Sequence, residues 1–318
     1  MVKGRVLVCG ASGFIGRNLF EYFDSIGFET YGTCFKNKPK VFNPSIFQAD
    51  LRDKDEAIWA TRGMDIVINA AAMTDGIGVF SEEINAKAFV EANNQINANL
   101  AEAACVNRIE NFVFLSCTIM YPSSGIPLKE EEFDPNKVHP KYSILAEMKI
   151  FGEERCRHFA ELGNTKYTVV RHTNIYGPYD KFDLNRGHVL SATIAKVMTS
   201  KNNEIVVWGR GQESRDFLYV DDQMRFIRNA INLQESNFEI FNVGVGKTHT
   251  VNELVEIIIS HSGRKFKIVH DLTRPSIETH MNINVDKARR ILNWQPKFSL
   301  DAGIAQTINW YCHSRGCL

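Results

Sequence analysis

Short apolar runs alternate with longer amphipathic stretches over roughly the first 175 residues of the chain. The apolar runs predict strands at 5–9, 30–35, 46–49, 65–70, 111–116 and 167–171. Helical spacing of apolar residues predicts helices at 13–26, 82–106 and 141–162. Strands that alternate with helices form βαβ units, whose parallel sheet is covered by helices on both faces. The pattern therefore predicts an α/β protein built on a doubly wound parallel sheet.

The alternation of predicted strands and helices becomes less regular after about residue 175, where segments shorten and glycine and proline become more frequent. Helical spacing there predicts helices at 187–200, 219–233, 250–262, 285–293 and 300–313. We interpret this half as a smaller α+β substrate-binding lobe against the carboxyl edge of the sheet. The expected organisation is a domain at 1–175 and a lobe mainly at 176–318, with an interleaved boundary because no long linker separates them.

Composition excludes several classes of function. The 318 residues include 37 basic and 37 acidic side chains, so the formal net charge is zero. A protein that coats nucleic acid or an anionic membrane needs a basic excess, and neither partner is expected. No apolar run approaches the ~20 residues of a membrane span. The seven cysteines are scattered without a CxxC pair, which disfavours a metal site or a disulfide framework and favours the reducing cytoplasm.

A glycine-rich turn joins the first predicted strand to the first predicted helix. Its sequence is Gly10-Ala11-Ser12-Gly13-Phe14-Ile15-Gly16. Gly10 permits a tight turn, Gly13 lets the backbone approach a pyrophosphate, and Gly16 lets the helix lie close to the strand. The helix N-terminus would present N–H groups to the phosphates. We therefore expect a Rossmann-type dinucleotide site here; the alternative is a purely structural strand–turn–helix.

The spacing of these glycines, GxxGxxG, resembles the extended short-chain dehydrogenase/reductase family of NAD-dependent epimerases and dehydratases. Two further segments match that family: Asp50-Leu51 after the third strand and Asn69-Ala70-Ala71-Ala72 at the end of the fourth. The resemblance implies that Asp50 and Leu51 lie against the adenine. It also implies that Ala70, Ala71, Ala72 and His172 line the cofactor.

The end of the second strand bears on the choice of cofactor. An acidic residue there would bind the ribose hydroxyls of NAD. This chain has Cys34, followed by Lys36, Lys38 and Lys40. The missing carboxylate and the nearby ammonium groups favour a 2′-phosphate, so we expect NADP(H). NAD(H) is the alternative, with the lysines forming only a solvated loop.

Residues 112–122 resemble the fifth strand and active-site loop of the family. The family's Ser or Thr hydroxyl, four residues before the tyrosine of a Tyr-Gly or Tyr-Pro pair, corresponds to Cys117. A thiol is a weaker hydrogen-bond donor than a hydroxyl, so Ser116 or Thr118 is expected to assist or replace it. The alternative is that Cys117 is a small buried filler.

Tyr142, at the start of the third predicted helix, resembles the tyrosine of the family's Tyr-x-x-x-Lys motif, which exchanges a proton with the carbonyl or alcohol oxygen. In the family the lysine lowers the pKa of the tyrosine and holds the nicotinamide ribose, but position 146 is alanine. Lys149 lies on a similar helical face, about 4.5 Å further along the axis, and is not expected to replace it. Three explanations of Ala146 are open. The chain is an engineered, impaired variant, it is a natural enzyme without the lysine, or the catalytic tyrosine is a residue other than Tyr142.

The C-terminal half resembles the sugar-nucleotide enzymes of the family. Residues 171–178 match their R-x-x-N-x-Y-G-P segment, and residues 215–222 match R-x-F-x-x-V-x-D. A guanidinium such as that of Arg215 binds phosphate oxygens in pairs. The resemblance implies that the substrate is bound by Asn174, Val189, Lys196, Trp208, Arg215 and Arg274.

Residues 173–182, 187–190 and 206–211 resemble the GDP-L-fucose synthase group most closely. In that group a histidine, matched here by His188, works with a loop cysteine as acid and base in 3,5-epimerisation. The position of that cysteine is Ile119 in this chain, and isoleucine exchanges no proton, so epimerisation is not expected. The alternative for His188 is a surface histidine at a helix start.

These features together predict a nicotinamide-dependent oxidoreductase that acts at C4 of a GDP-activated hexose or heptose, as a 4-keto reductase or a 4-dehydrogenase. The catalytic side chains would be Tyr142 with Cys117, Ser116 or Thr118. The alternatives are a sugar-nucleotide 4-epimerase with tightly bound NAD and a catalytically degraded nucleotide-binding protein. The resemblance also implies a homodimer.

Overall fold

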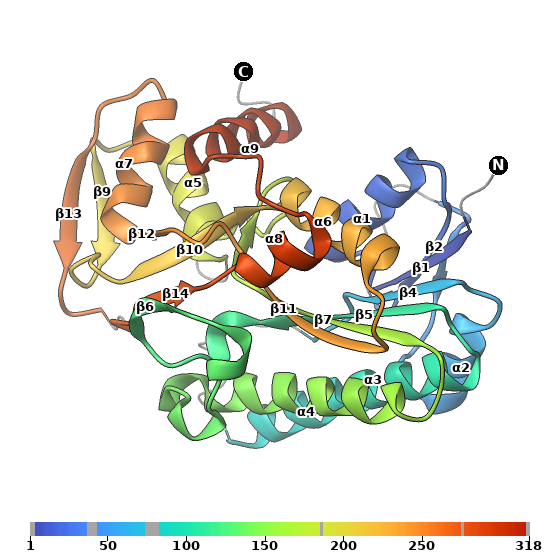
Figure 1. Ribbon diagram of the computed structural model, residues 1–318. Helices are drawn as coiled ribbons and strands as arrows, with labels where there is room; N and C mark the ends of the chain where they lie inside the picture. Colours follow the sequence, from blue (N-terminus) through green and yellow to red (C-terminus); the bar gives the residue numbers. More distant parts are fainter. Residues whose placement is uncertain (1–3, 37–42, 74–82, 185–186, 275–276, 316–318) are drawn as a thin grey trace.

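Seven parallel strands form the central sheet of the computed structural model, which describes residues 4–36, 43–73, 83–184, 187–274 and 277–315 (Figure 1). Their order is β11-β7-β5-β4-β1-β2-β3. The chain runs outward from β1 to β3 and returns to β4 on the other side of β1, which makes a topological switch point above the carboxyl ends of β1 and β4. The strands are β1 (Arg5–Cys9), β2 (Glu29–Cys34), β3 (Ile46–Gln48), β4 (Ile66–Asn69), β5 (Asn111–Cys117), β7 (Lys166–His172) and β11 (Phe238–Val243).

Helices cover both faces of this sheet. One face carries α1 (Phe14–Ser25), α6 (Val220–Leu233) and α8 (Asp286–Leu292), and the other carries α2 (Lys54–Thr61), α3 (Glu83–Val106) and α4 (Ser143–Ala160) (Figure 1). Side chains alternate along β1 as a strand requires. Val6 and Val8 join the core shared with α1 and α6, whereas Leu7 and Cys9 join the core under α2, α3 and α4. The predicted Rossmann-type doubly wound sheet is confirmed.

A second lobe has smaller sheets and its own apolar core. The sheets are β12-β10-β8, β13-β9 and β14-β6. Their strands are β6 (Ser124–Leu128), β8 (Asn174–Tyr176), β9 (Glu204–Trp208), β10 (Ser214–Tyr219), β12 (Thr248–Thr250), β13 (Lys267–Asp271) and β14 (Met281–Ile283). The helices α5 (Val189–Thr199), α7 (Val251–His261) and α9 (Leu300–Arg315) bury Ile194, Leu254 and Ile304 in its core.

The two halves of the chain exchange elements. β11 comes from the C-terminal half but pairs with β7 at the edge of the large sheet, from Phe238 beside Tyr167 to Val243 beside His172. α6 and α8, also from that half, lie over the same sheet. A pattern of local hydrophobicity contains no information on this pairing, because the partners are about 70 residues apart.

The helices predicted for the C-terminal half correspond to α5, α6, α7, α8 and α9 within a few residues at each end. α2, which has only eight residues, was not predicted. Asp53 is its N-cap, and the Asp53 carboxylate accepts the N–H groups of Asp55 and Glu56. No helix within the described ranges is long and apolar enough to cross a membrane. The same ranges hold no group of three or more His, Cys, Asp or Glu side chains that could ligate a metal ion.

Candidate active site

The glycine-rich turn between β1 and α1 has the shape that a dinucleotide phosphate requires. Gly10 has φ +79°, and a Cβ there would lie 2.8 Å from Cα of Ala71. A Cβ on Gly16 would lie 2.1 Å from the carbonyl oxygen of Gly10, so only glycine lets α1 approach the strand. Gly13 is the N-cap of α1 and is exposed, no side chain caps the helix there, and no acidic residue occupies the first turn. The backbone N–H groups of Phe14 and Ile15 therefore begin a helix whose positive end is open to an anion.

Two basic side chains lie after β2 and β3, where the sequence predicts the adenosine of the cofactor. Lys36 is exposed after β2, and its ammonium lies 5.6 Å from the centre of the Phe35 ring. Arg52, which was not a predicted site residue, lies 4.8 Å from the same ring. Arg52 also binds both carboxylate oxygens of Asp50, at 2.8 and 2.6 Å, and this pairing lowers the pKa of Asp50. Cys34 is buried; Lys38 and Lys40 lie outside the described residues.

The small residues after β4 border the turn. The space a Cβ on Gly10 would need is taken by Ala70 and Ala71, and Ala72 is exposed beyond them. The amide of Asn69 accepts the N–H of Ala71 at 3.2 Å and donates to Asn97 of α3 at 3.1 Å. These bonds hold the end of β4 beside the glycine-rich turn. Leu51 is buried below in the core under α2.

Cys117 and His172 stand side by side at the carboxyl ends of β5 and β7, where the two residues are register partners. Nδ1 of His172 lies 2.8 Å from the carbonyl oxygen of Thr173, and burial lowers the pKa of His172 to about 4. The imidazole is therefore uncharged at neutral pH. Burial raises the pKa of Cys117, which keeps the thiol protonated. Thr118 follows in a short 3₁₀ helix, Thr118–Met120, and is buried.

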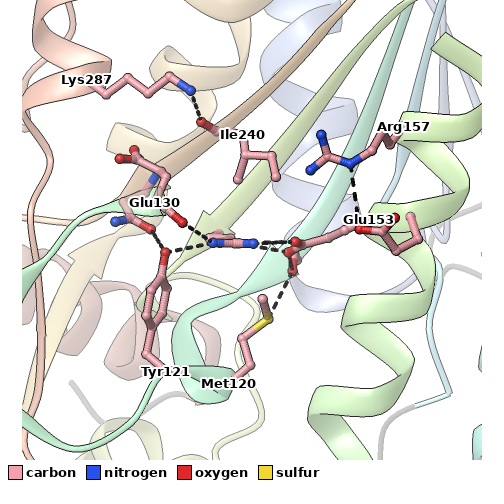
Figure 2. A network of polar contacts seen from close by, with 11 residues as sticks. Met120, Tyr121, Glu130, Glu153, Arg157, Ile240 and Lys287 are labelled. Atoms are coloured by element: carbon pink, nitrogen blue, oxygen red, sulfur yellow. Dashed lines mark hydrogen bonds and ion pairs between the residues drawn. The ribbon is translucent and has the colours of Figure 1, made fainter. Parts of the chain in front are cut away.

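A buried polar network holds this loop in place (Figure 2). The hydroxyl of Ser116 donates to Oε1 of Glu153 at 2.5 Å, and Glu153 forms an ion pair with Arg171 at 2.6 Å. Arg171 also donates to the hydroxyl oxygen of Tyr121 at 2.8 Å, and Tyr121 donates to Asn242 of β11 at 2.9 Å. Figure 2 shows Tyr121 and Glu153 on opposite sides of the guanidinium. Ser116 is fully buried in this network, so its hydroxyl serves the scaffold of the site.

The start of α4 supplies the next candidates. Tyr142 ends a short 3₁₀ helix, is buried, and lies against the ring of His139. Ala146 is buried in α4, and its methyl group presents no ammonium to the carboxyl end of the sheet.

Lys149 does reach that end of the sheet. Its Nζ donates to the carbonyl oxygen of Leu115 in β5 at 2.7 Å and lies 5.3 Å from the centre of the Phe114 ring. Burial lowers the pKa of Lys149, while the charge of Lys149 opposes the rise in the pKa of Cys117 and helps to lower that of His172. Lys149 therefore places an ammonium group beside the active-site loop, in addition to the guanidinium of Arg171. The available signal was its position seven residues, or two helical turns, after Tyr142.

His188 approaches the same region from the second lobe. It is the N-cap of α5, its side chain is 76% exposed, and its charge contributes to the lowered pKa of His172. The structure therefore brings Cys117, His172 and Lys149 to one edge of the sheet, and the charge of His188 in the second lobe acts on His172 there.

The candidate substrate residues form two groups. In the first, Asn174 of β8 donates to the carbonyl oxygen of Asp216 at 3.1 Å, and Arg215 of β10 donates to the carbonyl oxygens of Ser214 and Thr279. Asp216 is buried, accepts two backbone N–H groups after β11, and has its pKa raised to about 6 by burial. This group ties the second lobe to the end of the large sheet.

The second group lies on α5 and β9, with Arg274 just after β13. Lys196 donates to the carbonyl oxygen of Val206 at 2.8 Å, and the guanidinium of Arg274 stands 5.4 Å from the centre of the Trp208 ring. Val189, Val206 and Trp208 expose apolar surface that a soluble lobe would otherwise bury. An exposed indole with a guanidinium beside it suits a planar base.

Comparisons with known proteins bear on the family of the chain. The family model described as "NAD dependent epimerase/dehydratase family" matches residues 6–244. GDP-L-fucose synthase of Escherichia coli (strain K12) is 29% identical, with 99% of this chain and 98% of the relative covered. GDP-mannose 3,5-epimerase 1 of Oryza sativa subsp. japonica is 28% identical, with 97% and 82% covered. GDP-L-colitose synthase of Yersinia pseudotuberculosis is 27% identical, with 98% and 99% covered.

Solved structures show the same fold. UDP-glucose 4-epimerase of Thermotoga maritima, solved with UDP-glucose, superposes with a TM-score of 0.85 at 24% identity and covers 98% of this chain and 99% of its own. MoeE5 in complex with UDP-glucuronic acid and NAD superposes with a TM-score of 0.83 at 22% identity, covering 98% and 100%. With its glycine-rich turn at the switch point and a family match over residues 6–244, the chain belongs to the NAD dependent epimerase/dehydratase family.

Proposed function

We propose that this protein is a nicotinamide-dependent oxidoreductase that acts at C4 of a GDP-activated hexose or heptose. One observation carries the proposal: the open turn at Gly13 and the ammonium of Lys149 lie at the same carboxyl edge of the sheet, where the second lobe brings His188. A dinucleotide that crosses this edge extends from the helix N-terminus toward Cys117. A ligand held by the second lobe meets it there.

The nucleotide sugar is inferred from the relatives, which include a GDP-L-fucose synthase, a GDP-L-colitose synthase and a GDP-mannose 3,5-epimerase. The exposed apolar surface of Val189, Val206 and Trp208 is the proposed site of the base. Arg274 beside the indole and Arg215 near the start of β10 supply guanidinium groups for the diphosphate. The exposed apolar surface and the two guanidinium groups together fit a ligand that is planar at one end and anionic in the middle.

The cofactor would supply or accept a hydride at C4. The residues of the turn bind its phosphates, and Lys149 holds the nicotinamide ribose, since an ammonium that donates to the Leu115 carbonyl keeps two further N–H donors. Lys149 thus takes the role that the family gives to the lysine of its motif. NADP(H) is favoured because Cys34 replaces a carboxylate at the end of β2 and because Lys36 and Arg52 bring positive charge there.

Tyr142 is the proposed donor or acceptor of the proton on the C4 oxygen. Cys117 and Thr118, at the end of β5, would donate hydrogen bonds to that oxygen. Ser116 is left out of this role because its hydroxyl donates to Glu153. The direction of the reaction, 4-keto reduction or alcohol oxidation, follows from which substrate is offered.

The test is turnover of GDP-sugars by the full chain. The protein is incubated with NADPH or NADH and GDP-4-keto-6-deoxymannose, and with NADP⁺ or NAD⁺ and GDP-mannose, and products are identified by mass spectrometry. A change of two mass units in the sugar with matching consumption of cofactor supports the proposal. Unchanged GDP-sugars under all four conditions, with both ligands bound, would refute it and indicate a degraded nucleotide-binding protein.

A sugar-nucleotide 4-epimerase is the second candidate, because the solved structures that share the fold include UDP-glucose 4-epimerase. An epimerase returns the hydride to the same carbon, so its NAD stays bound and is not consumed. Cofactor that copurifies with the protein and a sugar product of unchanged mass would favour this candidate over the first.

A further inference from the structure

A buried carboxylate lies directly behind the exposed histidine of the candidate site. Asp180 has a side chain 2% exposed, and its Oδ1 lies 3.4 Å from Nδ1 of His188, whose side chain is 76% exposed. The same oxygen accepts the N–H of Lys181 at 2.7 Å. The second oxygen, Oδ2, is buried and has no hydrogen-bond partner among the described residues. A buried charged group without full compensation is costly, which suggests that Asp180 has a task other than stability.

The backbone around Asp180 is held firmly in position. Tyr179 has φ +68°, a conformation that a bulky residue adopts at a cost, and its ring lies 3.7 Å below the guanidinium of Arg17 and 5.0 Å from the ring of Trp310. The amide of Asn18 donates to the carbonyl oxygen of Pro178 at 2.9 Å. Arg17 and Asn18 belong to α1, so the segment that carries Asp180 is tied to the helix that begins at the dinucleotide turn.

The other end of the pair is fixed as well. A Cβ on Gly187 would lie 2.4 Å from the carbonyl oxygen of Lys181, and the N–H of Gly187 donates to Asp183 at 2.9 Å. Only glycine therefore lets the chain return close enough to Asp180 for the next residue, His188, to meet its carboxylate. Such support on both sides is expected where the orientation of a side chain matters.

We propose that Asp180 is a positioning residue that holds the Nδ1 edge of His188 and leaves Nε2 as the edge that exchanges protons with the sugar. The inference rests on the proposed function, since it assumes a 4-keto sugar in the crevice. A carboxylate that accepts Nδ1–H fixes the neutral imidazole in the tautomer with a free Nε2 and stabilises the imidazolium once it forms. A bond of 3.4 Å is long, as acid–base contacts often are before substrate binds.

The charges around His188 act in both directions. The hydrogen bond with Asp180 raises the pKa of His188, and the Asp180 charge acts the same way, whereas desolvation and the positive charge of Lys181 lower it. The charge of His188 helps to lower the pKa of His172, which is uncharged at neutral pH, and the N-terminus of α5 also disfavours the His188 imidazolium. Asp180 is thus the group that keeps His188 able to carry a proton near neutrality.

The chemistry is proton exchange at a carbon next to the C4 carbonyl. Nε2 takes the proton of that C–H bond, whose electron pair forms a C=C bond to C4 while the carbonyl π pair moves onto the oxygen. Returning a proton from the imidazolium to the same carbon restores the ketone, and the exposed imidazolium exchanges its proton with water between the two steps. Ile119 supplies no acid on the other side, so the expected result is exchange of hydrogen with solvent and no inversion.

The first test measures the titration of His188 directly. Histidine resonances of the full chain are followed by NMR across pH, and the His188 signal is assigned by its absence in His188→Gln. In Asp180→Asn the pKa of His188 should fall toward or below the ordinary value of about 6.5. Asp301→Asn, which removes the carboxylate 2.9 Å from Nε2 of His261, is the matched control and should leave His188 unchanged. An unchanged titration in Asp180→Asn overturns the proposal, whether or not any GDP-sugar is turned over.

The second test follows deuterium. The protein is incubated in D₂O with GDP-4-keto-6-deoxymannose without added reduced cofactor, and label at C3 or C5 is measured by mass spectrometry and NMR. Asp180→Asn should slow uptake up to about 100-fold, the lower end of what a positioned acid–base group contributes. In the His188→Gln background the same change should have no further effect. An equal loss of deuterium uptake from Asp180→Asn in the wild-type and His188→Gln backgrounds would mean that Asp180 acts only on the fold, and would overturn the proposal. A shifted His188 titration with no conversion of any GDP-sugar would support the Asp180–His188 pair and refute only the proposed function.

Discussion

Replacing Glu153 with glutamine removes one charge of a buried pair and leaves the other in place. The side chains of Arg171 and Glu153 are 4% and 5% exposed and lie 2.6 Å apart. Glu153 accepts from Nε and Nη2 of Arg171 and from the hydroxyl of Ser116. Glutamine has one acceptor oxygen, and its NH₂ group would face the donors of a guanidinium that stays charged.

The expected loss in the free energy of unfolding is about 3–5 kcal/mol, the range measured when one partner of a buried ion pair is removed. Urea denaturation followed by fluorescence measures it. Glu102→Gln is the matched control, because it removes an ion pair with Lys54 whose side chains are 54% and 31% exposed. That change should cost less than about 1 kcal/mol.

The double variant Glu153→Met with Arg171→Met separates the charge from the packing. It should recover part of the loss, since no unpaired charge remains. Recovery is incomplete because Ser116 and Tyr121 lose partners. A loss in the free energy of unfolding for Glu153→Gln as small as that for Glu102→Gln would refute the reasoning. So would a double variant whose loss equals the sum of the losses for Glu153→Met and Arg171→Met alone.

Three further outcomes are expected. Gly16→Ala places a Cβ 2.1 Å from the Gly10 carbonyl oxygen. It should weaken NADPH binding at least about tenfold, or 1.4 kcal/mol, in a fluorescence titration. Gly125→Ala is the control and should leave binding unchanged, because its Cβ meets nothing within 4 Å. Lys149→Met should lower turnover about 100-fold or more with the fold intact by circular dichroism; unchanged turnover would exclude it from the site. Burial lowers the pKa of His172 to about 4 in the folded chain. Between pH 4 and about 6.5 the unfolded chain therefore binds a proton at His172 that the folded chain does not, so the free energy of unfolding should rise with pH in this range. Urea midpoints of His172→Phe should show a weaker rise.

Much of the fold follows from local pattern. The strands and helices of the first half, the glycine-rich turn and the five C-terminal helices all have short-range causes, such as apolar spacing or a glycine at φ +79°. α2 escaped because its eight residues carry no apolar stripe. β11 belongs to the large sheet through its pairing with β7, which lies about 70 residues earlier in the chain and which no local pattern indicates.

The site was harder to predict because its chemistry depends on long-range partners. Ser116 was a candidate donor to substrate, but Glu153, 37 residues away, accepts its hydrogen bond. Lys149 was set aside on axial distance alone, yet its side chain bonds to Leu115 at the active-site loop. Asp180 lies in the segment 173–182 that carries the resemblance but had no predicted role, and its contact with His188 is seen only in the folded chain.

Transfer of a labelled hydride tests the central proposal most directly. The protein is incubated with GDP-4-keto-6-deoxymannose and NADPH or NADH deuterated on either face of nicotinamide C4, and the sugar is analysed by NMR. We expect one deuterium at C4 of the sugar, from one face only, with an equal amount of oxidised cofactor. A sugar that carries no label at C4 while the cofactor stays reduced would contradict the proposed function.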